Sequence, residues 1–347
     1  MPDSPLADTP LPDSPLALNY RTAATELFGI RLPVVAGGLQ WLADADYVSA
    51  AGRAGIIGFI TAASFPDIPT LRDEIRKCRD LCDGAPFGVN VSMLPKLVQG
   101  ERTNEIFALI VDEGVKFVET SGRNPEAYLP PLKEAGIVVL HKVPAVRYAA
   151  KAQSIGVDAV SIVGAECGGH PGLDVIGSFV QAAMADEQIT IPYLIGGGVG
   201  TGSQVIAALA MGAAGVVVGT RFTVAEEIWA HEGYKQRLID ADERDTQMIM
   251  QSVRNTVRAL RNETTEIVAR YEAEHDDVTI QDLLPFVSGR IGRKAYETGD
   301  CSHGVLSVGQ SVVFADAIEP LADIVRRFEQ EMMKASRRLN AISAVSG

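Results

Sequence analysis

Eight short apolar runs, rich in β-branched residues, alternate with amphipathic stretches along most of this chain, and this alternation limits the possible folds. The runs are residues 33–38, 55–60, 87–93, 117–121, 138–143, 159–164, 193–197 and 215–219. Helical patterns between them include residues 70–81, 105–113, 145–155, 175–184 and 203–211. Strands that alternate with helices form parallel sheets. A doubly wound open sheet is one solution, but eight repeats with glycine-rich turns after the last two favour an α/β barrel of the TIM type, (β/α)8.

The alternation stops after residue 222, and this break suggests the domain organisation. Residues 223–315 are charged and mainly helical in pattern, so we expect a helical insertion or lid domain after the eighth strand. A long amphipathic pattern near the end then predicts a helix that returns to close the barrel. The barrel would comprise residues 21–222 and 316–347, although a separate C-terminal helical domain is the alternative. Residues 1–20 repeat Pro-Asp-Ser-Pro-Leu-Ala, which predicts a disordered arm.

Charge and cysteine content exclude several classes of protein. The formal net charge of −13 argues against nucleic acid and anionic membranes as partners. The four cysteines are too scattered for a disulfide framework, and we expect Cys78 and Cys82 to be buried thiols rather than metal ligands. No apolar run reaches transmembrane length, and the start lacks a signal-peptide pattern. The expected location is the cytoplasm.

The sixth strand leads into a turn with unusual chemistry. Glu166, Cys167, Gly168, Gly169 and His170 occupy five consecutive positions. The two glycines let the backbone lie flat against a bound ring, while the proline after His170 favours an extended histidine backbone. Barrels carry their active sites at the carboxyl ends of the strands, and imidazole titrates near neutral pH. His170 is therefore a candidate catalytic base, with a structural histidine as the alternative; Glu166 is expected to orient the turn.

Glycine-rich turns follow the seventh and eighth strands. Residues 196–202 contain five glycines, and Gly219 and Thr220 follow the eighth strand. In barrels these two loops often bind phosphate through backbone N–H groups and a helix amino terminus. The glycines lack the spacing of a dinucleotide fingerprint. The pair of turns predicts a site for a phosphorylated cofactor, and tight packing of the turns is the alternative.

Taken together, these segments resemble the nitronate monooxygenase (2-nitropropane dioxygenase) family. The similarity covers about residues 24–335. The matching motifs are Glu166-x-Gly168-Gly169-His170-x-Gly172, the glycines at 196–198, residues 207–216, Gly219-Thr220-Arg221-Phe222 and residues 86–90. FMN-dependent enoyl-thioester reductases and NADH:quinone reductases share much of this pattern.

The resemblance implies a flavin mononucleotide (FMN) cofactor. Asn90 would hydrogen-bond the isoalloxazine, and His170 would face the substrate as the catalytic base. Lys142 could bind the flavin or an anionic substrate, or be solvated at the rim. Gly37 is a further expected cofactor contact, in a turn that departs from the family's usual Pro-Met pattern. Gly168 and Gly169 would contact the flavin ring. The phosphate would be held by Gly197, Gly198, Gly219 and Thr220. Gly309 and Gln310 resemble a late glycine-glutamine segment that could roof the pocket.

The leading interpretation is an FMN-dependent oxidoreductase, a nitronate monooxygenase that oxidises alkyl nitronates or nitroalkanes with O2. The alternative is an FMN-dependent NAD(P)H:quinone or enoyl reductase, and a third interpretation is a non-catalytic flavin-binding protein. We expect small-molecule partners, no metal, no nucleic acid and no membrane. The natural substrate, the reductant and a homodimeric state remain open.

Overall fold

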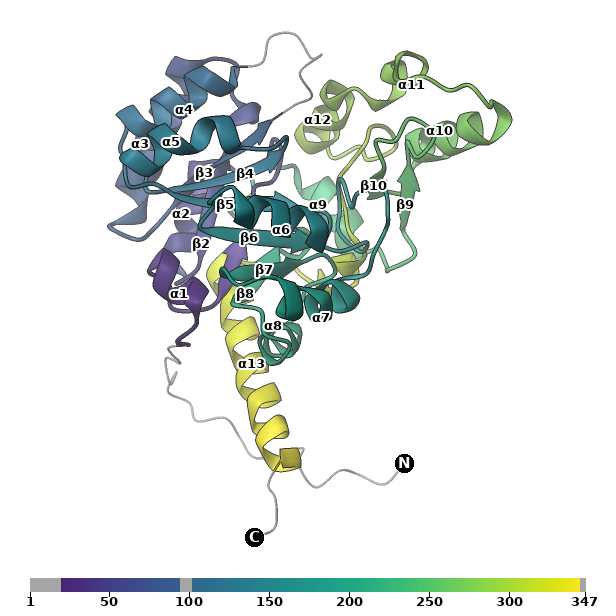
Figure 1. Cartoon of the computed structure of the whole chain (residues 1–347). Coiled ribbons are helices and arrows are strands. Elements are labelled where there is room, and N and C mark those ends of the chain that lie inside the picture. The colour runs from purple at the N-terminus through teal and green to yellow at the C-terminus, as the bar shows by residue number, and fades with distance from the viewer. Residues whose placement is uncertain (1–19, 94–101, 344–347) are drawn as a thin grey trace.

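A closed barrel of eight parallel strands, each paired with the next in sequence, forms the centre of the protein (Figure 1). The computed structural model describes residues 20–93 and 102–343 of the 347-residue chain, so the expected N-terminal arm lies outside it except for Tyr20. The strands are β1 (Val34–Ala36), β2 (Ile57–Thr61), β3 (Gly88–Met93), β4 (Phe117–Gly122), β5 (Val138–Val143), β6 (Ala159–Val163), β7 (Tyr193–Gly196) and β8 (Gly215–Val218). The predicted TIM-type barrel is confirmed.

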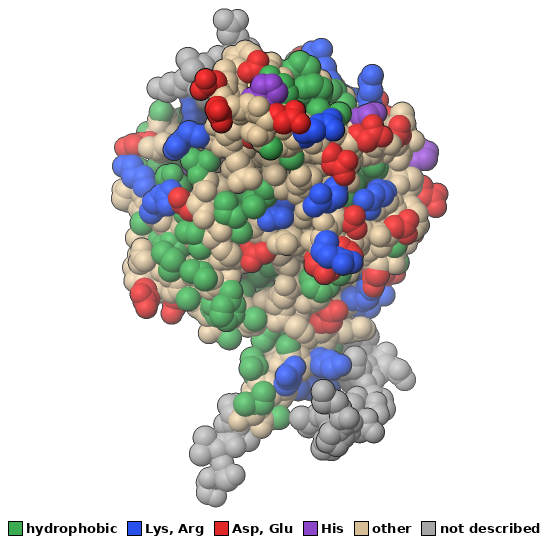
Figure 2. Space-filling view, turned by 90° about the vertical axis from the view of Figure 1, so that its right-hand side faces the viewer, with side chains coloured by type: hydrophobic (Ala, Val, Ile, Leu, Met, Phe, Trp, Pro, Cys, Tyr) green, Lys and Arg blue, Asp and Glu red, His purple; other side chains and the backbone are tan. Residues whose placement is uncertain are grey.

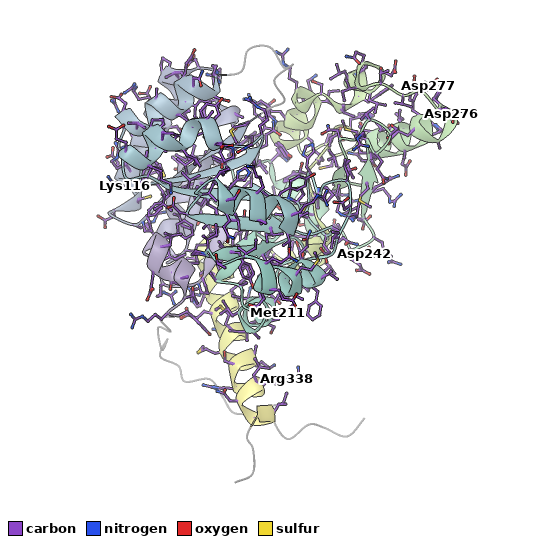
Figure 3. All side chains as sticks on the ribbon, in the orientation of Figure 1. Lys116, Met211, Asp242, Asp276, Asp277 and Arg338 are labelled. Carbon is purple, nitrogen blue, oxygen red and sulfur yellow. The ribbon has the colours of Figure 1, made fainter. Side chains whose placement is uncertain are left out.

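Helices surround the barrel in the order that the alternation predicts. Between consecutive strands lie α2 (Ala45–Arg53), α3 (Ile68–Cys82), α4 (Thr103–Asp112), α5 (Leu129–Glu134), α6 (Val146–Ser154), α7 (Ser178–Gln188) and α8 (Gly202–Ala210), and the short α1 (Ala23–Phe28) precedes β1. The long α13 (Leu321–Ser343) packs against α8 and α2 and so closes the ring. Its far end, which carries Arg338, projects beyond the barrel (Figure 3).

The strands bury both faces, as parallel strands do. Outward residues pack against the helices in a large apolar core. Inward residues such as Val35, Phe59, Leu140 and Leu194 form a second apolar cluster inside the barrel. Nearer the carboxyl ends of the strands the inward positions become polar, and there the candidate site lies.

The insertion after β8 is mainly helical, as predicted. It contains α9 (Glu232–Ile239), α10 (Glu263–Glu274), α11 (Ile280–Val287), α12 (Gly289–Thr298) and the 3-10 turn η4 (Gln310–Phe314). It also contains an antiparallel hairpin of β9 (Thr246–Ile249) and β10 (Val257–Leu260), which the sequence analysis missed. Residues of this hairpin, including Ile249 and Val257, form a small separate apolar core with Val268 and Leu283.

The insertion lies at the carboxyl-end side of the barrel. Lys116, which directly precedes β4, lies on the opposite side of the molecule from Asp276 and Asp277 in the insertion (Figure 3). Acidic and basic side chains are intermixed over the insertion side (Figure 2). The exact boundaries of a barrel and an insertion domain remain a prediction. No helix within residues 20–93 and 102–343 is long and apolar enough to cross a membrane.

Candidate active site

A layer of polar side chains lies inside the barrel near the carboxyl ends of the strands. Strand register places Thr61 beside Asn90 and Asn90 beside Glu119. It likewise places Lys142 beside Ser161. Residues in register on neighbouring strands face the same side of the sheet, and these positions continue the inward pattern of Phe59 and Leu140. The layer brings together two predicted cofactor residues, Asn90 and Lys142.

Glu119 connects those two residues. Asn90 Nδ2 donates a 2.5 Å hydrogen bond to Glu119 Oε2. Lys142 Nζ lies 3.0 Å from Glu119 Oε1, in an ion pair rather than an aligned hydrogen bond. Because Glu119 is fully buried, its charge needs this partner. The sequence analysis missed Glu119, although a single carboxylate in the middle of a predicted barrel strand is a signal that could have identified it.

Two hydroxyl groups in this layer lack hydrogen-bond partners. Thr61 Oγ1 and Ser161 Oγ are buried, and no hydrogen bond reaches either atom from the part of the chain that the structure describes. Buried polar atoms in folded proteins are nearly always paired with protein, water or ligand. The layer is therefore suited to a bound group with several polar atoms, such as the polar edge of a flavin ring.

His170 lies above this region on the loop after β6. The backbone of Gly169 exchanges two hydrogen bonds with Arg258 of β10, at 2.9 and 2.7 Å. The His170 side chain remains accessible to solvent. Surrounding protein atoms nevertheless lower the pKa of its imidazole by desolvation. The imidazole therefore carries no proton charge at neutral pH and can accept a proton.

Gly168 lies against protein backbone. A Cβ atom at this position would lie 2.7 Å from Gly309 N. The same late segment donates from Gln310 N to Glu166 O at 2.9 Å and from Gly309 N to Thr220 Oγ1 at 2.9 Å. The segment expected to roof the pocket thus packs directly on the loop that carries His170. Gly168 is required for that packing, whatever contact it makes with a cofactor.

Glu166 and Cys167 have supporting roles. Glu166 Oε2 accepts hydrogen bonds from the backbone N and the Oγ of Ser178, at 3.0 and 2.9 Å, and so caps the first turn of α7. This agrees with the expectation that Glu166 orients the turn. Burial raises the pKa of Cys167 to about 12, so its side chain stays a thiol and is no nucleophile at neutral pH. Cys78 and Cys82 are buried free thiols, as predicted.

The glycine turn after β7 is partly closed by the chain itself. Gly202 N donates to Glu331 Oε2 of α13 at 2.6 Å, and Gly200 N donates to Gln204 Oε1 at 2.8 Å. The Gly202 N–H at the amino terminus of α8 thus already has an acceptor within the protein, and a phosphate contact at this turn stays a prediction. Gly197 and Gly198 have φ values of 91° and 76°, which favour glycine.

The turn after β8 is more open. A Cβ atom on Gly219 would meet only Leu39 Cδ2, at 3.6 Å. The next residue, Thr220, is buried, and its hydroxyl can still donate a hydrogen bond while accepting one from Gly309 N. Gly37, by contrast, extends the pairing of β1 with β8, because its N–H donates a 3.0 Å hydrogen bond to Val218 O. The Gly37 N–H therefore already has an acceptor within the barrel.

Comparison with known proteins identifies the family of the chain. The family model described as nitronate monooxygenase matches residues 21–331. A Rhodococcus jostii (3aS,4S,5R,7aS)-5-hydroxy-7a-methyl-1-oxo-octahydro-1H-indene-4-carboxyl-CoA dehydrogenase is 33% identical over 228 residues, which are 66% of this chain. That alignment spans only 62% of the relative's length.

Two solved structures cover nearly the whole chain. FabK from Thermotoga maritima superposes with a TM-score of 0.84 at 29% identity, covering 93% of this chain and all of FabK. Nitroalkane oxidase from Streptomyces ansochromogenes gives a TM-score of 0.78 at 25% identity, covering 92% of this chain and all of that protein.

Proposed function

The chain belongs to the nitronate monooxygenase family and is an oxidoreductase, and we propose that it uses FMN to oxidise small nitronates or nitroalkanes with O2. The observation that carries the proposal is the polar layer of Asn90, Glu119 and Lys142 near the carboxyl ends of the strands, the end at which the loop with His170 leaves β6. The nitroalkane oxidase similarity supports the choice of substrate class.

The residues present fit an FMN cofactor. Asn90 and Lys142 would meet the polar edge of the ring, where the unpaired hydroxyls of Thr61 and Ser161 add further hydrogen-bonding atoms. Gly197, Gly198, Gly219 and Thr220 would hold the phosphate, and Gly169 would leave the ring accessible. Glu119 would keep Lys142 in place through their ion pair. When bound, FMN supplies the electron-transfer chemistry that these side chains cannot provide.

His170 is the proposed base for a neutral nitroalkane. The protons on the carbon beside a nitro group are acidic, so a positioned imidazole can remove one and leave the nitronate. The lowered pKa of His170 keeps its ring unprotonated at pH 7, as this role requires. Lys142 would then face a negatively charged substrate or ring edge with its ammonium group. A preformed nitronate needs only orientation by these groups.

A second candidate function is reduction or dehydrogenation of an acyl thioester with a nicotinamide cosubstrate. The Rhodococcus jostii relative is named as a carboxyl-CoA dehydrogenase, and it is more identical to this chain than the nitroalkane oxidase is. His170 could equally exchange a proton with a hydroxyl group or with the carbon beside a thioester carbonyl.

Anaerobic absorbance spectroscopy of the purified protein distinguishes the two functions. Our proposal expects FMN, rather than FAD, to be released on denaturation, and it expects nitronates to bleach the bound flavin. Rapid bleaching by NADH or NADPH, with no response to nitronates, would instead establish the second candidate. Flavin that neither compound reduces would refute both.

A further inference from the structure

The β9–β10 hairpin of the insertion is fastened to the loop that carries His170. The backbones of Gly169 and Arg258 exchange two hydrogen bonds. The Arg258 guanidinium adds two more, because Nε donates to Ala165 O and Nη1 donates to Thr246 Oγ1, each at 3.1 Å. Arg258 thus contacts the start of the loop with its side chain and the residue before His170 with its backbone.

The Arg258 side chain is enclosed by protein. The residue is only 8% exposed, so water does not readily replace its hydrogen-bond acceptors. Burial lowers the pKa of the guanidinium, which nevertheless stays charged at neutral pH. Hydrogen bonds from a charged donor are stronger than those between neutral groups. The guanidinium therefore holds the loop at Ala165 and the hairpin at Thr246 as one unit.

The loop depends on contacts of this kind, because its own sequence does not fix its backbone. Two glycines directly precede His170, and glycine backbone is the most permissive. Gly169 has a φ of 81°. On the side away from the hairpin, the late segment donates from Gln310 N to Glu166 O at 2.9 Å. The loop thus lies between two parts of the insertion, and Arg258 supplies the contact on the hairpin side.

We propose that Arg258 is a positioning residue for His170, because its side chain fixes the loop backbone to which the imidazole is attached. This inference rests on the proposed role of His170 as a base. Gly169 is bonded directly to His170, and Pro171 restricts the backbone on the other side. A displacement of about 1 Å at a catalytic group lowers a rate by about 100-fold. The insertion would in this way set the position of the base in the barrel.

Anaerobic stopped-flow reduction of the flavin tests the inference with a neutral nitroalkane and with its preformed nitronate. Arg258→Met keeps an apolar stem but removes the donors, so the nitroalkane rate should fall about 10–100-fold while the nitronate rate changes little. Arg258→Lys supplies one donor and should recover part of the loss. The matched control is Arg261→Met, an exposed arginine directly after β10 whose side chain bonds Gln247 of the same hairpin, and it should react like the wild type.

A double variant separates positioning from a general loss of stability. In the His170→Asn background, Arg258→Met should lower the nitroalkane rate no further, because no base remains to be positioned. Equal losses with both substrates, or an undiminished effect of Arg258→Met in the absence of His170, would overturn the inference. Thermal unfolding shows whether each variant is folded, and Arg258→Lys carries the same comparison if Arg258→Met is not.

Hydrogen exchange of the holoenzyme gives a readout that does not depend on turnover. Arg258→Met should speed the exchange of the loop amides, including the Gly169 amide that donates to Arg258 O, relative to Arg261→Met. Unchanged protection of these amides would overturn the inference whatever the enzyme oxidises. The proposed function fails by a different result, namely a wild-type flavin that neither nitroalkane nor nitronate reduces, so the two failures are distinguishable.

Discussion

Asn90 donates a 2.5 Å hydrogen bond to Glu119, and both side chains face the interior of the barrel near the ends of their strands. Lys142 reaches the second oxygen of the same carboxylate. One buried acid thus organises the two polar side chains that the family resemblance implies at the flavin ring.

Glu119→Gln should weaken both the fold and cofactor binding. The substitution leaves Lys142 without its counter-charge, and breaking a buried pair costs about 3–5 kcal/mol. Since Lys142 is 22% exposed and can rehydrate, we expect a loss of about 3 kcal/mol or less in the free energy of unfolding, measured with urea. Glu134→Gln, at an exposed site on α5, is the control. Wild-type stability and FMN affinity in Glu119→Gln would refute the central role of Glu119.

His141 should make the protein less stable in acid. Burial lowers the pKa of His141 to about 4, while an unfolded histidine titrates near 6.5. The unfolded chain therefore binds a proton that the folded protein does not, so stability is intact above pH 6.5 and falls as the pH drops toward 4. The loss is about 3 kcal/mol across that interval.

The comparison that checks this is His141→Gln, with the exposed His303→Gln as control. Urea unfolding at pH 7 and pH 4.5 should show a smaller loss for His141→Gln than for the wild type. An equal loss in both proteins would mean that His141 does not contribute to the acid sensitivity.

Gly168→Ala should disturb the catalytic loop. The added Cβ would lie 2.7 Å from Gly309 N, and backbone cannot move aside as a flexible side chain can. Overpacking of this kind costs about 1–3 kcal/mol. Gly289→Ala is the matched control, because its Cβ would approach no atom closer than 3.7 Å. Thermal unfolding should show a lower Tm for Gly168→Ala only. Equal Tm values for the two variants would refute the packing role of Gly168.

Gly219→Ala should separate cofactor binding from folding. An added Cβ would meet only Leu39 Cδ2, at 3.6 Å, and the φ of −117° is negative, so alanine is accommodated. We therefore expect the Tm of the apoprotein to be unchanged and the affinity for FMN, measured by flavin fluorescence, to fall at least about 10-fold. Unchanged FMN affinity would contradict a phosphate contact at Gly219.

The strands could be predicted because most of the apolar runs are bounded by glycine, proline or polar residues. Which residues face inward could not be read as easily, since buried parallel strands are apolar on both faces. Glu119 was missed because the mixed pattern of residues 117–121 does not show which side chains face the barrel interior. The hairpin β9–β10 was missed because its alternation is short and interrupted at Arg254–Thr256.

Contacts between the insertion and the barrel could not be predicted from the sequence. Nothing local to Gly168 indicates that Gly309 packs on it, and nothing local to Gly169 indicates that its backbone pairs with Arg258. These contacts depend on how residues 223–315 return over the barrel. The motif residues of the barrel could be identified, whereas the residues that hold them in place required the structure.

The most direct test of the account is the anaerobic rate of flavin reduction in His170→Asn, measured by stopped flow with a neutral nitroalkane and with its preformed nitronate. If His170 removes the proton, the rate with the nitroalkane should fall by about 10²–10⁴-fold, while the rate with the nitronate changes little, because that substrate has already lost its proton. Equal losses with both substrates, or no loss with either, would contradict the account.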